Sequence, residues 1–228
     1  MKPFPALSPS SIADFEGCPK RWHEVKILKK YPFVQTESLT YGNDVHEKLE
    51  HYTKFQTPLP EHLEYVAPVI DALREGGYVL VAELELGITK DWDPCGFWDK
   101  NCFLRGKVDL VAVNQKQAIL IDWKTGKRKP DPFQLQIYGA ILYQLLSLER
   151  VDAGFAWLKT QESDAYSITA ENFPEIVTDI MQRTDKMRQM YEQQDFPART
   201  SPLCCWCPAL NDCKEAIYYK ENIGRRRK

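Results

Sequence analysis

The chain has 228 residues, 43% hydrophobic and 12% aromatic, so it can bury a sizeable core and wholesale disorder is not expected. Its 30 Lys and Arg against 32 Asp and Glu give a net charge of −2, which excludes any global charge signature of a nucleic-acid or membrane partner. Because no run of 18 apolar residues and no secretory or transit leader is seen, we expect a cytoplasmic protein without a membrane partner.

The first third of the chain has helical patterns. Ser8 or Ser10 can cap a helix that Pro19 breaks or bends. Apolar residues at steps of four, four and three predict an amphipathic helix over 41–55. A third helix should stop at the glycine pair 76–77, where a left-handed cap is easily formed. Two amphipathic helices therefore precede any strand.

Strand patterns follow. Alternating or β-branched runs predict strands over 78–88, 103–113 and 117–123, the last two joined as a hairpin around Asn114. The Trp-rich segment 91–102 is interpreted as an ordered loop. The remaining predicted elements are an apolar helix over 131–148, a strand over 151–159 and an amphipathic helix over 171–193. This order predicts a mixed α/β core.

We expect one domain over 1–228. Its expected parts are a helical region over 8–77, a core sheet and helix over 78–160, a helix with a cysteine cluster over 161–218, and a basic tail over 219–228.

Charged side chains cluster on two of the predicted strands. Side chains two apart share a face of a strand, so Asp122 and Lys124 project together while Trp123 faces the other side. On the preceding strand, Arg105, Lys107 and Asp109 share one face, and the other, buried face carries Leu104, Val108 and Leu110. If these strands pair in the right register, two carboxylates and a lysine converge. Oxygen ligands of this kind suit hard divalent cations.

Single residues of this set have ordinary structural explanations. Asp-x-Lys is common on a solvated strand face, and a lone helical histidine such as His46 is usually a surface or satisfied core residue. By default Gln134 and Tyr138 are a helix surface and a core edge. Three nearby carboxylates remain weaker candidates for the site, with a solvated-surface role favoured for each: Glu50, Glu83 and Glu85.

The ordered combination is more informative. The segments GNDVHEKLE, GKVDLVAV, ILIDWKTG and QLQIY follow one another along the chain. The series resembles the motifs of the PD-(D/E)XK nuclease superfamily, in its RecB-like branch. The matching residues are Gly42 and His46, Gly106 and Asp109, Asp122 and Lys124, and Gln134 and Tyr138. The resemblance implies a restriction-endonuclease-like α/β fold, with a central mixed sheet flanked by helices.

The resemblance also implies a role for each residue. It implies an Mg²⁺ or Mn²⁺ site formed by His46, Asp109, Asp122 and the backbone carbonyl of Trp123. Lys124 would then assist the attacking water. Two further residues are implied to orient that lysine or touch the substrate, Gln134 and Tyr138.

Seven cysteines are unevenly placed, with four crowded between positions 204 and 213. In a reducing compartment such clustering favours metal or iron–sulfur ligation over disulfides. Cys204, Cys207 and Cys213 need a fourth ligand, and Cys18 is the natural candidate if the two ends of the domain meet. Four thiolates suit Zn²⁺ or a [4Fe–4S] cluster; spacing does not separate them, although zinc is slightly favoured.

The cysteine pattern is similar to the iron–sulfur staple of AddB-type nucleases and of CRISPR-adaptation nucleases. That resemblance implies a structural [4Fe–4S] cluster, rather than zinc, joining the N- and C-terminal ends. Cys205 leaves the register ambiguous beside Cys204. Cys95 and Cys102 have no counterpart and are interpreted as ordinary thiols.

Local cations are the candidates for holding a nucleic-acid backbone. Lys127, Arg128 and Lys129 follow the active strand directly, with a solvated turn as an equally good explanation. Arg105 and Lys107 share a face with Asp109. The arginines of the tail, 225–227, are better explained as a solubilising segment.

The resemblance implies a metal-dependent DNA exonuclease acting from free ends, with single-stranded DNA favoured over duplex, in recombination, repair or CRISPR-type processing, and with a possible DNA-processing protein partner. An endonuclease or end-trimming factor is the alternative within enzymes. A catalytically silent nucleic-acid-binding scaffold and a zinc-stapled adaptor are the alternatives from other classes. Oligomeric state and polarity of degradation are not encoded in any motif.

Overall fold

The computed structural model describes residues 3–129 and 131–223. The chain divides into two compact units, Gln35–Ile180 and a second made of Met1–Val34 with Met181–Lys228. The arginines expected to form a basic tail, 225–227, lie outside the described residues. In the described part of the chain, no helix is long and apolar enough to cross a membrane.

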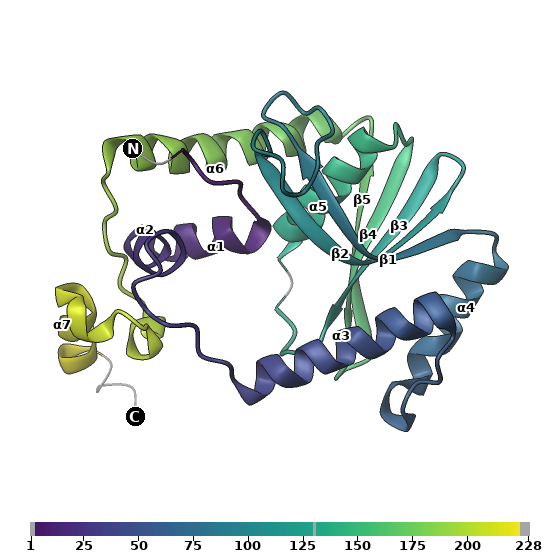
Figure 1. Cartoon of the computed structure of the whole chain (residues 1–228), viewed down its shortest axis with the longest axis horizontal. Helices are drawn as coiled ribbons and strands as arrows, with labels where there is room; N and C mark the ends of the chain where they lie inside the picture. The colour runs from purple at the N-terminus through teal and green to yellow at the C-terminus, as the bar shows by residue number, and fades with distance from the viewer. Residues whose placement is uncertain (1–2, 130, 224–228) are drawn as a thin grey trace. The chain divides into compact units, whose positions relative to one another are not determined.

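The unit Gln35–Ile180 contains the sheet (Figure 1). Its elements are α3 (Glu37–Phe55), the 3₁₀ helix η2 (Glu61–Val66), α4 (Ala67–Glu75), β1 (Val79–Ile88), β2 (Leu104–Asn114), β3 (Gln117–Lys124), α5 (Pro132–Leu145), β4 (Arg150–Trp157), β5 (Glu162–Thr169) and the first part of α6 (Phe173–Gln193). The described residues form one five-stranded sheet in the order β1-β2-β3-β4-β5. Only β3 and β4 pair in parallel, through the crossover helix α5. The expected mixed α/β core is confirmed.

Local sequence explains where the helices begin. Thr36 caps α3 by accepting a hydrogen bond from the Leu39 amide (3.3 Å), so the helix starts before the apolar stripe. Asp131 caps α5 through the amide of Phe133 (3.1 Å). Gly77 follows α4 with φ of 76°, the left-handed conformation expected of the glycine pair.

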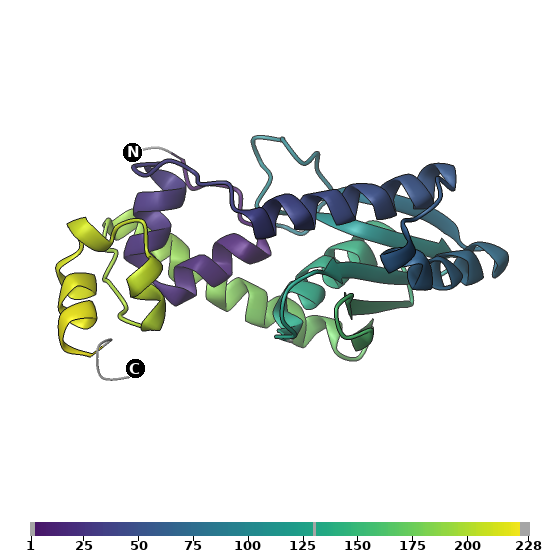
Figure 2. The same cartoon turned by 90° about the horizontal axis from the view of Figure 1, so that it is seen from below.

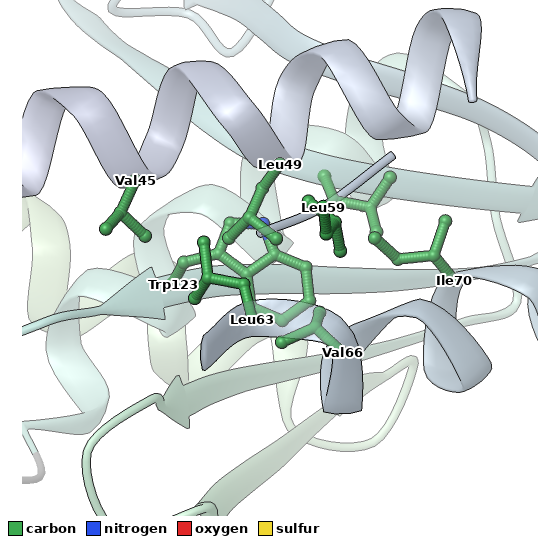
Figure 3. Close-up of a cluster of buried hydrophobic side chains, with 8 residues drawn as sticks. Val45, Leu49, Leu59, Leu63, Val66, Ile70 and Trp123 are labelled. Atoms are coloured by element: carbon green, nitrogen blue, oxygen red, sulfur yellow. The ribbon is translucent and has the colours of Figure 1, made fainter. Parts of the chain in front are cut away.

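Two helices cover one face of β3. Leu49 on α3 and Leu63 on η2 both lie against the indole of Trp123 (Figure 3). Val45 and Ile70 extend the same buried cluster along α3 and α4. Since neighbouring side chains of a strand face opposite sides, Asp122 is directed to the α5 side, as the alternation predicts. In the turned view, α3 is seen running alongside the sheet (Figure 2).

Strand β2 departs from the expected alternation. A Cβ on Gly106 would lie only 2.0 Å from the ring of Tyr138, so this position faces α5. Leu110, four residues later, packs instead in the cluster with α3 and α4. The prediction that Leu110 shares a face with Leu104 and Val108 is therefore wrong. The side-chain alternation shifts between positions 106 and 110, which include Asp109.

The second unit contains α1 (Pro9–Gly17), α2 (Pro19–Arg21), the π-helix η1 (Trp22–Ile27), the rest of α6, the 3₁₀ helices η3 (Pro202–Trp206) and η4 (Leu210–Asp212), and α7 (Lys214–Asn222). Ser8 caps α1, and Cys18 is extended where Pro19 starts a new helix. Trp22 is fully buried, with its ring edge-on to Phe15 and Tyr191. This aromatic core is separate from that of the sheet.

Candidate active site

The site begins where β2 and β3 separate. Their antiparallel pairing ends at Leu110 and Ile121, whereas β3 continues to pair with β4 as far as Lys124. We call the place where the two strands separate the fork. Here a side chain takes the place of a backbone acceptor, because Asp109 Oδ2 accepts a hydrogen bond from the backbone N–H of Trp123 (2.7 Å). The N–H and C=O of one strand residue point to the same edge, so the carbonyl of Trp123 is also directed toward Asp109.

Helix α3 contributes the histidine. His46 Nδ1 lies 3.1 Å from Asp109 Oδ1. The hydrogen bond to Asp109 outweighs burial and raises the pKa of the imidazole. One turn earlier, a Cβ on Gly42 would lie 3.4 Å from Thr125 Oγ1, so α3 passes close to the end of β3. The Gly-x-x-x-His spacing thus places the imidazole at the fork.

Asp122 is the buried acid of the site, with only 4% of its surface exposed. Its Oδ1 accepts a hydrogen bond from Gln134 Nε2 (2.6 Å), and its Oδ2 forms an ion pair with Lys124 Nζ (2.5 Å). Burial, and then the charge of Asp109, raise the pKa of this carboxyl to about 6. These unfavourable effects on the anion are the ones that a bound cation would relieve.

Lys124 is held in a defined position. Besides Asp122, its ammonium donates to Gln134 Oε1 at 3.2 Å and lies 4.9 Å from the ring centroid of Phe155. Gln134 therefore bonds both members of the Asp-x-Lys pair, with its amide group on one and its carbonyl on the other. Acid, lysine and glutamine form a closed triangle.

Tyr138 completes the α5 side. Burial, and then Asp122, raise the pKa of its hydroxyl, which also bonds to Gln134. Its ring lies directly over Gly106, where any side chain would collide with it. The glycine of the Gly-x-x-Asp motif is thus explained by packing.

The structure adds a carboxylate that the sequence interpretation assigned to the solvated surface. One ligand atom each from His46, Glu83 and Asp109 lie within 4.8 Å of one another. The side chain of Glu83 is only 15% exposed, so the solvated-surface interpretation is wrong for this residue. These groups line a cleft of about 430 Å³ that also includes Lys107. An imidazole, two half-buried carboxylates and a nearby carbonyl fit Mg²⁺ or Mn²⁺.

The predicted nucleic-acid contacts are dispersed. Arg128 pairs with Asp164 of β5 (2.5 Å), and the guanidinium of Arg105 lies over the ring of Trp98 (4.7 Å to the centroid). The side chains of Lys127 and Lys129 are exposed on the segment after β3. Their contacts with nucleic acid stay a prediction.

Four of the five cysteines of the second unit line a single small cavity, and Cys205 is the one that is not among its lining residues. The ends of the chain meet around it through Lys20 and Glu215 (3.2 Å). Within the described ranges, no three of the four sulfur atoms lie within 4.8 Å of one another. Zinc at 2.3 Å from each thiolate would require spacings of about 4 Å. The four lining cysteines are Cys18, Cys204, Cys207 and Cys213.

Each of these sulfur atoms accepts a backbone N–H. The bonds run from Arg21 and Arg199 to Cys18, from Ser201 to Cys204, from Ala209 to Cys207 and from Ala216 to Cys213. Such bonds favour thiolates and are typical of metal or cluster ligands. Despite these bonds, burial raises the pKa of Cys207 and of Cys213. Burial also raises the pKa of Cys95 to about 12, and Cys102 donates to the Leu104 carbonyl (3.4 Å). Neither Cys95 nor Cys102 lines the cavity.

Comparison with solved structures finds proteins that are similar to this chain to different degrees. A putative exonuclease from Eubacterium rectale has a TM-score of 0.56 at 12% identity, covering 96% of this chain and 93% of its own. A protein named SSO0001 has a TM-score of 0.48 at 17% identity, with 94% and 88% covered. An alkaline exonuclease from Laribacter hongkongensis has a TM-score of 0.33 at 10% identity, with 83% and 93% covered. Comparison with curated proteins finds no match.

The family model of the PD-(D/E)XK nuclease superfamily matches residues 69–214. The match includes Asp109, Asp122 and Lys124 and begins after His46. It covers more than half of the chain, and it coincides with the fork of β2 and β3 that positions the two carboxylates. The chain therefore belongs to the PD-(D/E)XK nuclease superfamily.

Proposed function

We propose that the protein is a deoxyribonuclease that requires Mg²⁺ or Mn²⁺ and degrades single-stranded DNA from free ends. The observation that carries this proposal is the buried Asp122, whose pKa is raised by burial and then by the charge of Asp109, and which is ion-paired with a fixed Lys124. A module that only binds nucleic acid has no use for two close carboxylates facing phosphate. The catalytically silent scaffold is therefore disfavoured.

The chain offers His46, Asp109, Asp122 and the carbonyl of Trp123 as ligands. When bound, a divalent cation there supplies positive charge against the phosphate oxygens and acidifies water. Asp109 would serve both as a metal ligand and as a hydrogen-bond acceptor. Its Oδ2 accepts from the backbone N–H of Trp123, and this bond fixes the carboxylate in the fork.

The remaining residues position the attacking water and the phosphate. Lys124 lies beside the metal ligands, where its ammonium can hold a water or a phosphate oxygen. Gln134 sets the direction of that ammonium, and Tyr138 packs Gln134 against β2. Water between Lys124 and the metal ligands would attack the phosphorus in line with the leaving oxygen.

The first test compares an end-labelled linear single strand with a closed circle of the same sequence, in Mg²⁺ and in Mn²⁺. We expect the linear strand to be degraded and the circle to survive, because an exonuclease needs an end. Asp122→Asn should show no cleavage. Cutting of the circle would establish the alternative, an endonuclease or end-trimming factor, and loss of neither substrate would contradict the nuclease proposal.

We also propose that the second unit holds a [4Fe–4S] cluster on Cys18, Cys204, Cys207 and Cys213. Four cysteines around one cavity support it, and a backbone N–H donates to each of their sulfur atoms, as is typical of cluster ligands. The cluster and the order of the four motifs support placement in the RecB-like branch. They also support a role in recombination, repair or CRISPR-type DNA processing, with a protein partner from such a pathway.

Cys207→Ser should remove the brown colour and the broad absorbance of an iron–sulfur protein, and lower its thermal stability. The matched control is Cys205→Ser, because Cys205 does not line the cavity. Iron and acid-labile sulfide should stay near four per chain in the control and fall in the Cys207 variant. Stoichiometric zinc in a colourless wild-type protein would overturn the cluster in favour of a zinc staple.

A further inference from the structure

Glu83 has an unusual position in β1. It lies between the paired residues Ala82 and Leu84, whose partners Leu110 and Val108 flank Asp109 on β2. The register thus places Glu83 opposite Asp109, and its φ of 56° is left-handed. A residue other than glycine rarely adopts this conformation inside a strand. The carboxylate is directed into the cleft that His46 and Asp109 line.

The distances suit one cation. Ligand atoms of Glu83, His46 and Asp109 lie within 4.8 Å of one another. Around an octahedral ion with bonds of about 2.1 Å, adjacent ligands are about 3 Å apart and opposite ones about 4 Å. Small side-chain rotations would bring all three atoms onto one ion. The set comes from three separate elements, α3, β1 and β2.

Lys107 pairs with Glu83. Its ammonium forms an ion pair with that carboxylate. Lys107 stands two residues before Asp109 on β2 and lines the same cleft, with half of its side chain exposed. Positive charge therefore already occupies one side of the candidate metal site.

We propose that Glu83 is a further ligand of the divalent cation and that Lys107 is its exchangeable counter-ion. Without metal, the ammonium neutralises Glu83 and limits repulsion with Asp109. When the cation takes the carboxylate, the ammonium is released into the cleft and contacts the phosphate of the nucleic-acid strand. This inference rests on the proposed metal-dependent cleavage of DNA, and it adds a ligand and a coupling device to that site.

The exchange couples two binding events. Metal binding frees a cation for phosphate, and phosphate bound to Lys107 frees Glu83 for metal. By linkage, each ligand must tighten the other by the same factor. The enzyme would then need the metal for tight substrate binding as well as for cleavage.

The test is Mn²⁺ binding to metal-free protein, measured by calorimetry and by the electron paramagnetic resonance signal of free Mn²⁺, without nucleic acid. Glu83→Gln should weaken binding at least about tenfold. Lys107→Met, which keeps an apolar stem of similar length, should tighten it severalfold because the competitor is removed. Glu85→Gln, an exposed acid on the same strand, is the matched control and should change binding by less than about twofold.

A second arm measures the affinity of a fluorescent oligothymidylate with and without Mn²⁺ in the Lys124→Ala background, where cleavage is not expected. Adding Mn²⁺ should tighten binding, and Lys107→Met should abolish that gain. If the Glu83→Gln and Glu85→Gln variants bind Mn²⁺ with equal affinity, the ligand assignment is overturned. If Mn²⁺ still tightens oligothymidylate binding as much in Lys107→Met, the exchange is overturned. Wild-type protein that binds no Mn²⁺ would instead overturn the metal-dependent function itself. Circular dichroism establishes that each variant is folded.

Discussion

Replacement of Lys124 by alanine is expected to lower DNA cleavage by about a thousandfold, the range found when one positioned catalytic group is removed. The ammonium is fixed beside the candidate metal ligands by Asp122 and Gln134, so the substitution removes a group that is already in position. Affinity for single-stranded DNA should change by less than about threefold, because one cation among several contributes little to backbone binding. Single-turnover cleavage and fluorescence anisotropy in EDTA measure the two effects separately.

Lys127→Ala is the matched control, since it removes an exposed lysine three residues further along. Cleavage by this variant should fall only as far as its DNA affinity falls. Lys124→Arg distinguishes charge from position: a guanidinium keeps the positive charge, but it is larger and planar and cannot hold a water or a phosphate oxygen in the same place. A Lys124→Ala enzyme that retains more than about a tenth of wild-type activity would contradict the role assigned to this residue.

Local periodicity explains what could be predicted from the sequence. Neighbouring side chains of a strand point to opposite faces of the sheet, so the opposite directions of Asp122 and Trp123 follow from their being adjacent in β3. The same is true of Gly42 and His46, which are one helical turn apart on α3. Each of the four motifs lies within a single element, so the directions of its own residues could be predicted from their spacing. That the motifs come together was expected from the resemblance to the nuclease superfamily.

Features that depend on two elements were not predictable in this way. Glu83 enters the site only through the register of β1 on β2 and a left-handed backbone that no propensity indicates. The shift of alternation near Asp109 likewise arises because β2 leaves β3 while staying paired with β1. Strand β5 (Glu162–Thr169) has few apolar residues, since it is an edge strand held mainly by pairing with β4.

The basic residues show the same limit. Lys127, Arg128 and Lys129 are equivalent in the sequence, yet in the described part of the chain the fold brings Arg128 into an ion pair with Asp164 on β5 and leaves the two lysines exposed. Arg105 was grouped with Lys107 by alternation. The fold places Arg105 over the rings of Phe97 and Trp98, while Lys107 reaches the cleft of the metal ligands. Charge alone does not separate these situations.

Replacement of Asp122 by asparagine should abolish cleavage and at the same time stabilise the metal-free protein. In the folded state, burial and the charge of Asp109 raise the pKa of the Asp122 carboxyl from 3.8 to about 6. An acid whose pKa is raised by folding destabilises the fold once it is ionised. At 1.36 kcal/mol per unit, the penalty at pH 7.5 is of the order of 1–3 kcal/mol. Asparagine resembles the neutral acid in shape and avoids this penalty.

The sign of the effect follows from the same linkage. Below about pH 4 the carboxyl is protonated in both folded and unfolded chains, so wild type and Asp122→Asn should be about equally stable. As the pH rises from about 4 to about 6, the unfolded chain ionises before the folded one, so the wild type loses stability relative to the variant; above about pH 6 the difference stays constant. Thermal unfolding of the metal-free proteins between pH 4.5 and 8 measures this divergence.

Divalent metal should reverse the order. Mn²⁺ binds the wild-type carboxylate and stabilises the folded state by mass action, whereas Asp122→Asn lacks the charge that holds the ion. The melting temperature of the wild type should therefore rise with Mn²⁺ at pH 7.5, and that of the variant much less. Because protons compete with the metal for Asp122 and for His46, whose pKa is also raised, the wild-type shift should shrink as the pH falls toward 5. If metal-free Asp122→Asn is no more stable than metal-free wild type, the Asp122 carboxylate is not a desolvated charge that a cation would stabilise.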